Sequence, residues 1–491
     1  MTAINLPMIQ FLRSPRAVRA ADAVAPRTGG MNLLSLGLLL AALLIGSAVA
    51  IYDGRLHWLG MTWISVALAA LTGALILCRG DVAGRVRLRL VEWVAAIGVI
   101  FQLMHVTLCG AQASPGANVP AGALLACVAA MAVGVSLIWR RAAIGVPLLL
   151  GAFAVAAFAC IRTSPHPRID VLMFQRESAA AMLSGSHPYA VRYRDVYGAG
   201  SGEFYGAGVS RDGWLTYSFP YPPASLLLVL PAQALGDVRY AHAAAMIVAA
   251  ALIAATGRTR LAALAAAVLL TSPRTLFVVQ NGWTEPLLIA LAAATMFCAI
   301  RLRGATWAAL GLWIAAKQYM ILVLPLLRRV APGLGSRRDR RQTVLAAVLL
   351  AAAVTVPFAA TEPRSFLRSV GQWQFVQPFR HDALSYPAME AALHPAKEIG
   401  RLGHVAVPFA AAAMAIVLAG WKAPRTPGGL MVGAALVFFC FFAFNKQAFC
   451  NYYLFVIGLC CCAAAGLDPS EQTFDQSGDR RLRPEPLTGI V

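Results

Sequence analysis

The chain has 491 residues, of which 59% are hydrophobic and only 13% are charged. Soluble globular domains carry about 25% charged residues, so this composition excludes an ordinary soluble protein. The formal net charge of +20 would suit a nucleic-acid partner, but the basic residues lie in short links between apolar runs. Because that placement is typical of cytoplasmic loops in membrane proteins, we expect membrane lipids as partners and no nucleic acid.

Long uncharged runs predict an all-α fold, a polytopic transmembrane helical bundle. A helix needs about 20 apolar residues to cross the hydrocarbon core of a bilayer. After a cytoplasmic tail at 1–31, spans are expected near 32–51, 58–78, 91–109, 121–139, 142–161, 238–256, 260–273, 283–300, 342–360, 403–421, 428–444 and 448–466. With the interrupted segments described next, about twelve to fourteen crossings are expected before a cytoplasmic tail at 467–491.

Two long polar stretches, 162–220 and 361–402, are expected as loops on the external face. Two apolar segments are expected to cross only in part. The first, 221–235, opens with two prolines, which can begin a helix but not continue one. The second, 305–327, carries Lys317 near its middle, and the basic residues at both of its ends favour two half-helices over one continuous helix.

Asp170 is the main catalytic candidate in the sequence. It closely follows the fifth predicted span and begins a stretch with helical apolar spacing to Ser184, which predicts an amphipathic helix lying on the membrane. Low-dielectric surroundings raise the pKa of a carboxyl group and suit it to act as a base. The alternative is an ordinary interfacial carboxylate that caps this helix or pairs with Arg168.

The residues after Asp170 add a pattern of ordered motifs. Gly185-Ser186-His187-Pro188-Tyr189 follows the predicted surface helix, and Tyr217-Ser218-Phe219-Pro220-Tyr221-Pro222-Pro223 follows that. This order resembles the GT-C superfamily of membrane glycosyltransferases, and most closely glycosyltransferase family 87, the polyprenol-phosphate-mannose-dependent mannosyltransferases. The segment from Asn445 to Tyr453 is similar to the late polar motif of that family. The resemblance covers 142–466.

The sequence departs from the family pattern at its N-terminal end. Many GT-C enzymes place the loop with the catalytic Asp after their first span, whereas four predicted spans precede it here. We therefore expect 32–141 to be additional transmembrane helices and 142–466 to be the GT-C-like catalytic core.

The resemblance implies an inverting transfer of a hexose, mannose in that family, from a polyprenyl-phosphate-linked donor to a lipid or glycan acceptor. The reaction would take place on the external face of a bacterial plasma membrane, with Asp170 as the general base and no cofactor. No metal ion is expected, because the sequence lacks the Asp-rich pairs and glycine-rich loops of nucleotide-sugar enzymes. The alternative is a metal ion that one carboxylate holds together with several water molecules.

Polar residues on the predicted external face supply the remaining site candidates. The donor phosphate needs cations or hydrogen-bond donors, and the candidates are Lys317, Lys446, Arg274 and His381, with Arg380 beside the last. For the two lysines the alternative is snorkelling to lipid headgroups, for Arg274 a boundary of a span, and for His381 a surface turn. The substrate-binding candidates are Tyr189, Tyr221, Gln280, Asn281, Gln318, Tyr319, Asn445 and Gln447.

Two other functions are compatible with the predicted topology. A transporter or flippase of a lipid-linked or small polar substrate would also be polytopic, but transporters often have broken helices at corresponding positions of two halves. No such correspondence is found in this sequence. A ligase that transfers a finished glycan would share both the topology and the external site.

Overall fold

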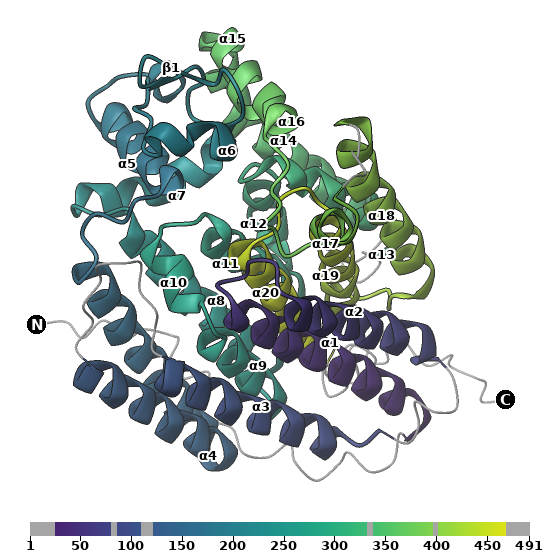
Figure 1. Cartoon of the computed structure of the whole chain (residues 1–491). Coiled ribbons are helices and arrows are strands. Elements are labelled where there is room, and N and C mark those ends of the chain that lie inside the picture. Colours follow the sequence, from purple (N-terminus) through teal and green to yellow (C-terminus); the bar gives the residue numbers. More distant parts are fainter. Residues whose placement is uncertain (1–24, 80–85, 110–120, 331–336, 396–400, 468–491) are drawn as a thin grey trace, which may run out of the picture.

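The computed structural model describes residues 25–79, 86–109, 121–330, 337–395 and 401–467, and these are nearly all helical (Figure 1). The predicted all-α class is confirmed at this level. Within these ranges, seven helices are long and apolar enough to cross a membrane: Gly30–Ile51, Trp58–Leu77, Leu88–Thr107, Gly122–Arg162, Arg239–Gly257, Arg338–Thr361 and Val405–Lys422. Shorter apolar helices lie at Pro223–Ala234, Arg260–Thr271, Gln318–Leu327, Pro427–Ala443 and Cys450–Gly466.

The N-terminal helices pack against the C-terminal part of the chain. They are α1 (Ala25–Ile51), α2 (Trp58–Leu77), α3 (Leu88–Cys109) and α4 (Ala121–Arg162). Helix α1 contacts α2 and also α20 (Cys450–Gly466), while α3 contacts α9 (Arg260–Thr271). The N-terminal helices therefore share one hydrophobic core with the helices that follow them.

Helix α4 consists of two helices that fold back on each other. Its regular geometry is interrupted at Arg141, where φ is −147° and ψ is 78°. Gly134 and Gly145 then face one another so closely that a Cβ added at Gly145 would lie 2.5 Å from the carbonyl oxygen of Gly134. The break falls at the short basic link that the sequence predicts between two spans, and glycine is required for the close approach of the two halves.

Later helices complete the bundle around a dense apolar core. They are α8 (Arg239–Gly257), α10 (Thr275–Gln280), α11 (Glu285–Arg301), α12 (Thr306–Ile314), α13 (Leu324–Val330), α14 (Arg337–Thr361), α18 (Arg401–Lys422), α19 (Pro427–Ala443) and α20. Helix α11 packs against α8 and α20, and α19 packs against α20. Helices α14 and α18 leave most of their apolar residues exposed, as expected for helices that face lipid.

The segment with Lys317 is interrupted where the sequence favours a break. Helix α12 ends at Ile314, and Lys317 has an extended backbone with φ of −155° and ψ of 147°. A 3-10 helix, η7 (Gln318–Val323), then leads into α13. At this break the Lys317 side chain contacts Thr284 and Glu285, at the start of α11.

Two polar parts of the chain form short elements, which we call the polar cap (residues 162–222 and 362–395). The first contains α5 (Asp170–Leu183), η4 (Pro188–Ala190), η5 (Gly198–Gly200), α6 (Ser201–Tyr205), β1 (Ser210–Arg211) and β2 (Trp214–Leu215), and leads into α7 (Pro223–Ala234). The second contains α15 (Pro363–Phe366), the π-helix η9 (Leu367–Gln372), α16 (Trp373–Val376) and α17 (Tyr386–Leu393). Figure 1 shows α5 to α7, β1, α15 and α16 together at one end, opposite α3 and α4.

The polar cap has an apolar core of its own. Strands β1 and β2 pair as a hairpin in which Ser210 faces Leu215. Helix α5, expected to lie on the membrane, buries Leu172 and Phe174 against Tyr189 and neighbouring aromatic residues of the cap. Because its apolar face is occupied by protein, α5 holds its first residue, Asp170, in a fixed place.

Candidate functional site

Asp170 is the first residue of α5, where the structure half-buries its carboxyl group. Its Oδ1 atom accepts hydrogen bonds from the backbone N–H of Val171 at 2.8 Å and from the hydroxyl of Tyr197 at 3.2 Å. No described side chain donates a hydrogen bond to Oδ2. Burial raises the pKa of Asp170 to about 6, although these hydrogen bonds and the charge of Arg380 lower it in part.

Four tyrosines of the polar cap lie within the range of the charge of this carboxylate. Burial is the main cause that raises the pKa of their phenols above the usual value, and the charge of Asp170 is the next cause in each. The four are Tyr197, Tyr205, Tyr217 and Tyr221. Within the described residues, the buried hydroxyls of Tyr205 and Tyr217 have no hydrogen-bond partner. Near neutral pH all four phenols stay protonated, and the hydroxyls of Tyr205 and Tyr217 keep a donor that no described group accepts.

Aromatic packing within the first part of the cap and against the second part holds these rings in place. Tyr217 stacks on Trp373 with ring centroids 4.2 Å apart, and Tyr197 stacks on Phe204 at 4.1 Å. The hydroxyl of Tyr189 donates to the backbone carbonyl of Tyr221 at 2.6 Å. Tyr189, a predicted substrate contact, is itself fully buried and supports the backbone of Tyr221.

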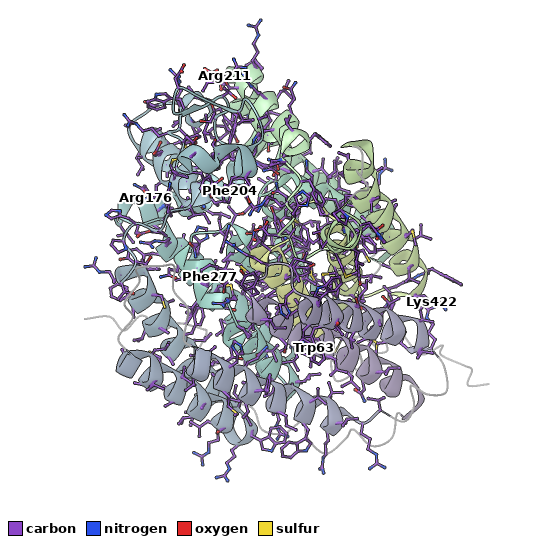
Figure 2. The ribbon with its side chains drawn as sticks, viewed as in Figure 1. Trp63, Arg176, Phe204, Arg211, Phe277 and Lys422 are labelled. Carbon is purple, nitrogen blue, oxygen red and sulfur yellow. The ribbon has the colours of Figure 1, made fainter. Side chains whose placement is uncertain are left out.

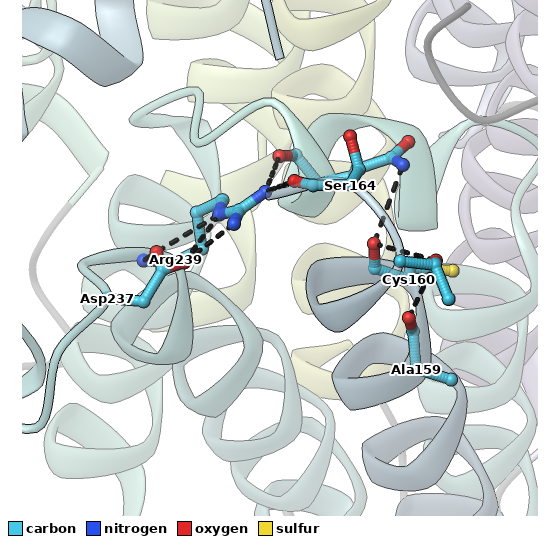
Figure 3. A network of polar contacts seen from close by, with 7 residues as sticks. Ala159, Cys160, Ser164, Asp237 and Arg239 are labelled. Carbon is cyan, nitrogen blue, oxygen red and sulfur yellow. Dashed lines mark hydrogen bonds and ion pairs between the residues drawn. The ribbon is translucent and has the colours of Figure 1, made fainter. Parts of the chain in front are cut away.

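A buried polar network fixes the base of α5 and the link that precedes it. The Arg239 guanidinium pairs with Asp237 at 2.6 Å and donates to the carbonyl oxygens of Ser164 at 2.6 Å and Gln280 at 3.1 Å (Figure 3). Nearby, Gln175 of α5 donates to the Gly282 carbonyl at 2.5 Å. These bonds join α4, α5, α8 and α10 at the level where the polar cap begins.

Gln175 also meets a histidine of the bundle. The Nε2 atom of His242 lies 2.9 Å from Oε1 of Gln175, and both side chains are completely buried. The contact between this histidine and this amide thus joins α5 to α8.

Arg380 is the charged residue that acts most directly on Asp170. Its guanidinium donates two hydrogen bonds to Asp382, at 2.9 and 2.8 Å. It also lies 4.5 Å from the ring centroid of Phe204, labelled in Figure 2, and 5.0 Å from that of Phe449. The neighbouring His381 is exposed, with its ring edge-on to Phe379.

The late polar motif holds the second part of the cap. The ammonium group of Lys446, a predicted phosphate contact, donates to the carbonyl oxygens of Phe375 at 3.1 Å and Gln377 at 2.6 Å. The amide of Gln447 donates to the Pro378 carbonyl at 3.1 Å, and the side chain of Asn445 accepts from the Gln447 backbone N–H. These residues shape the segment that carries Arg380.

Lys317 and Tyr319 both contact Glu285, a carboxylate that is not among the predicted site residues. The Lys317 ammonium pairs with Glu285 at 2.5 Å, and the Tyr319 hydroxyl donates to the same Glu285 oxygen at 3.3 Å. Between them, Gln318 donates to the carbonyl oxygens of Pro220 and Val370, at 2.7 and 3.2 Å. Gln318 thus joins the two parts of the polar cap to the bundle.

The other predicted site residues have structural contacts of their own. Arg274 forms an ion pair with Asp53, in the turn after α1. Gln280 donates from its side chain to the Cys160 carbonyl at 3.5 Å, and Asn281 donates to the Phe277 carbonyl at 2.8 Å within one turn.

The ring centroid of Tyr452 lies 5.6 Å from the Lys317 nitrogen. The site residues absent from the predicted site are Glu285, Tyr197, Tyr205, Tyr217 and Tyr452. Glu285 had a usable signal, because it is the one acidic residue between Asp237 and Asp339 and so stands out in a long apolar region. Tyr205 had none, since its role depends on how the cap folds.

No family model, curated protein or solved structure matches the chain. The function is therefore inferred from the chemistry of the candidate site residues described above. Within the described ranges, no three His, Cys, Asp or Glu side chains come together as a metal site would require. The arrangement offers instead a carboxylate with a raised pKa, several phenol donors and two buried or partly buried cations.

Proposed function

We propose that the chain is an integral membrane glycosyltransferase that moves a hexose from a polyprenyl-phosphate-linked donor to a lipid or glycan acceptor. One observation carries this proposal: the Asp170 carboxyl group accepts a hydrogen bond from Tyr197, has a pKa that burial raises to about 6, and exerts its charge on three further protonated tyrosines. Carboxylates, hydroxyl donors and aromatic ring faces suit a ligand with many hydroxyls and apolar C–H surfaces. The position of the cap next to apolar helices supports a lipid-linked donor.

In the proposed reaction, the acceptor hydroxyl binds to Oδ2 of Asp170, the oxygen to which no described side chain donates. Asp170 takes the proton as the hydroxyl oxygen attacks the anomeric carbon, and the bond from that carbon to the phosphate oxygen breaks on the opposite side. Polyprenyl phosphate leaves with the bonding electrons, so the anomeric configuration is inverted. General-base catalysis of this kind is typically worth about 10²- to 10⁴-fold.

The leaving phosphate gains negative charge and needs a cation near it. Arg380 is the best-placed residue, because its charge already acts on Asp170. Its ion-pair partner, Asp382, also pairs with Arg55 at 3.8 Å, so two guanidinium groups share one carboxylate and this cluster keeps a net positive charge. Asp382 and the aromatic rings of Phe204 and Phe449 keep the Arg380 guanidinium in one orientation. Lys446 contributes indirectly by fixing the backbone before Arg380.

The direct test is a transfer assay with purified protein reconstituted in vesicles. Radiolabelled polyprenyl-phosphate mannose, glucose or galactose is supplied together with a lipid extract of bacterial membranes as acceptor. We expect label in a new glycosidic product of inverted anomeric configuration. Movement of intact donor across the vesicle membrane with no new glycosidic bond would contradict the proposal and indicate a flippase.

The activity is expected to rise with pH through about 6. Below this pH the Asp170 carboxyl group is protonated and cannot accept the acceptor's proton, whereas above it the base is available. Tyr197→Phe removes a hydrogen bond that lowers the pKa of Asp170. In this variant the rise of the transfer rate with pH should therefore occur at a higher pH. A pH series of initial transfer rates measures this shift. The control is Tyr52→Phe, which changes an exposed tyrosine outside the cap. The pH dependence of its transfer rate should coincide with that of the wild type.

A further inference from the structure

A second polar pair lies buried beneath the polar cap. Glu285, the first residue of α11, is completely buried, and Lys317 is 6% exposed. The Lys317 ammonium contacts Glu285 Oε1 at 2.5 Å and the hydroxyl of Thr284 at 2.8 Å. Ionisable groups among membrane-embedded helices are rare and costly, and by default they are functional candidates.

The pair keeps unused hydrogen-bonding capacity on both partners. Within the described residues, Oε2 of Glu285 accepts no hydrogen bond although it is buried. A lysine ammonium has three N–H donors, and two of those of Lys317 are directed to Glu285 and Thr284. A carboxylate oxygen buried without a partner is costly, so a ligand that donates to it is strongly favoured.

Three aromatic rings surround the Lys317 ammonium. The ring centroids of Tyr221, Tyr319 and Tyr452 lie 5.1, 5.3 and 5.6 Å from its nitrogen. Such rings offer apolar faces to the C–H groups of a small cyclic ligand. The surroundings therefore combine apolar faces with one donor and one acceptor.

The charge of the pair indicates which ligand it fits. Because Glu285 neutralises Lys317, the two together offer no net positive charge to a phosphate. A hydroxyl group both donates and accepts hydrogen bonds, so it matches a free carboxylate oxygen beside an ammonium N–H. The chemistry favours the neutral hydroxyls of a sugar ring over the phosphate contact that Lys317 alone would predict.

Tyr221 connects this pair to Asp170. Burial is the main cause that raises the pKa of its phenol, the charge of Asp170 is the next, and the charge of Glu285 also contributes. Its ring is one of the three beside Lys317. The charges of the two carboxylates therefore both act on the same phenol.

We propose that Glu285 and Lys317 bind a hydroxyl group of the transferred hexose and select among hexose epimers, an inference that rests on the proposed function. The hydroxyl donates to Glu285 Oε2 and accepts from Lys317, while the ring packs between the tyrosines. In this arrangement Asp170 accepts the proton of the acceptor hydroxyl, and the Glu285–Lys317 pair binds the sugar of the donor.

The experiment measures donor binding without turnover. Polyprenyl-phosphate mannose, glucose and galactose are titrated calorimetrically into the full chain carrying Asp170→Asn, in lipid nanodiscs. We expect this parent to prefer one hexose. Adding Glu285→Gln should weaken the preferred hexose about 10- to 100-fold, the scale of one hydrogen bond to a charged group, and leave the three affinities nearly equal.

A matched variant and a second substitution keep the result interpretable. Glu177→Gln changes an exposed carboxylate of α5 and should leave the preference unchanged. If Glu285→Gln unfolds because Lys317 is left unpaired, Glu285→Gln with Lys317→Met removes both charges and should also abolish the preference. A parent with no preference, an unchanged preference, or equal weakening of all three hexoses would overturn the inference.

Failure of the proposed function gives a different result. If the wild-type protein transfers no hexose but the Glu285 variant loses epimer preference in binding, the subsite stands and the transfer reaction is wrong. If transfer occurs and the preference is insensitive to Glu285, the reaction stands and the subsite is wrong.

Discussion

Asp170→Asn is expected to lower the rate of hexose transfer by about 10²- to 10⁴-fold, the usual contribution of a general base. Asparagine has the shape of aspartate and can still accept hydrogen bonds from Val171 and Tyr197, so α5 should begin in the same place. It cannot accept the proton of the acceptor hydroxyl. Initial rates at saturating donor and acceptor, at pH 7 to 8, measure the loss.

Folding of this variant is expected to be intact. The pKa of Asp170 is higher in the folded protein than that of an ordinary aspartate, which means that burial of the ionised form opposes folding near neutral pH. A neutral asparagine removes that cost, so the melting temperature at pH 7 should equal or exceed that of the wild type. Full transfer activity in a folded Asp170→Asn protein would rule out the mechanism.

Arg239→Met is expected to lower the free energy of unfolding by about 3 kcal/mol, because breaking a buried ion pair leaves the remaining charge uncompensated. The guanidinium is almost completely buried, and it is bonded to Asp237 and to the carbonyl oxygens of Ser164 and Gln280. All of these groups would lose their donor at once. Thermal unfolding of purified protein in one detergent measures the change, and loss of order should spread to α5.

Two further variants separate the charge from the hydrogen bonds. Adding Asp237→Asn to Arg239→Met removes the uncompensated carboxylate and should recover part of the loss, whereas the two carbonyl oxygens remain without their donor. Arg211→Met changes an exposed arginine of the cap, at its outer tip in Figure 2, and should be nearly neutral. Equal melting temperatures for Arg239→Met and the wild type would show that this network does not stabilise the fold.

The assembly of the predicted site was only partly visible in the sequence. Asp170 was placed at the start of α5 by its position before an amphipathic stretch, and the break at Lys317 by a charge within an apolar run. The partners of both residues were not predictable. Tyr197 lies 27 positions after Asp170, and Glu285 lies 32 positions before Lys317. Local periodicity carries no information about such pairings.

Several residues predicted to bind substrate or phosphate are bonded to backbone carbonyl oxygens in the structure, and this too depends on the fold. A cationic or amide side chain can donate a hydrogen bond either to a ligand or to a backbone carbonyl oxygen. Only the tertiary structure decides which of these acceptors lies within reach. Lys446 bonds to the carbonyls of Phe375 and Gln377, and Gln318 bonds to those of Pro220 and Val370. These residues build the site by shaping its loops.

The sequence by itself determined that this is a helical membrane protein, because hydrocarbon requires long apolar segments whose backbone groups are paired internally, and both conditions act along a single helix. It also determined that the polar residues are concentrated in a few segments between the spans. Only the tertiary structure decided which polar side chains meet, since ion pairs such as Glu285–Lys317 form across helices. It also decided the surroundings of Asp170, because burial by the folded chain is what raises the pKa of that carboxyl group.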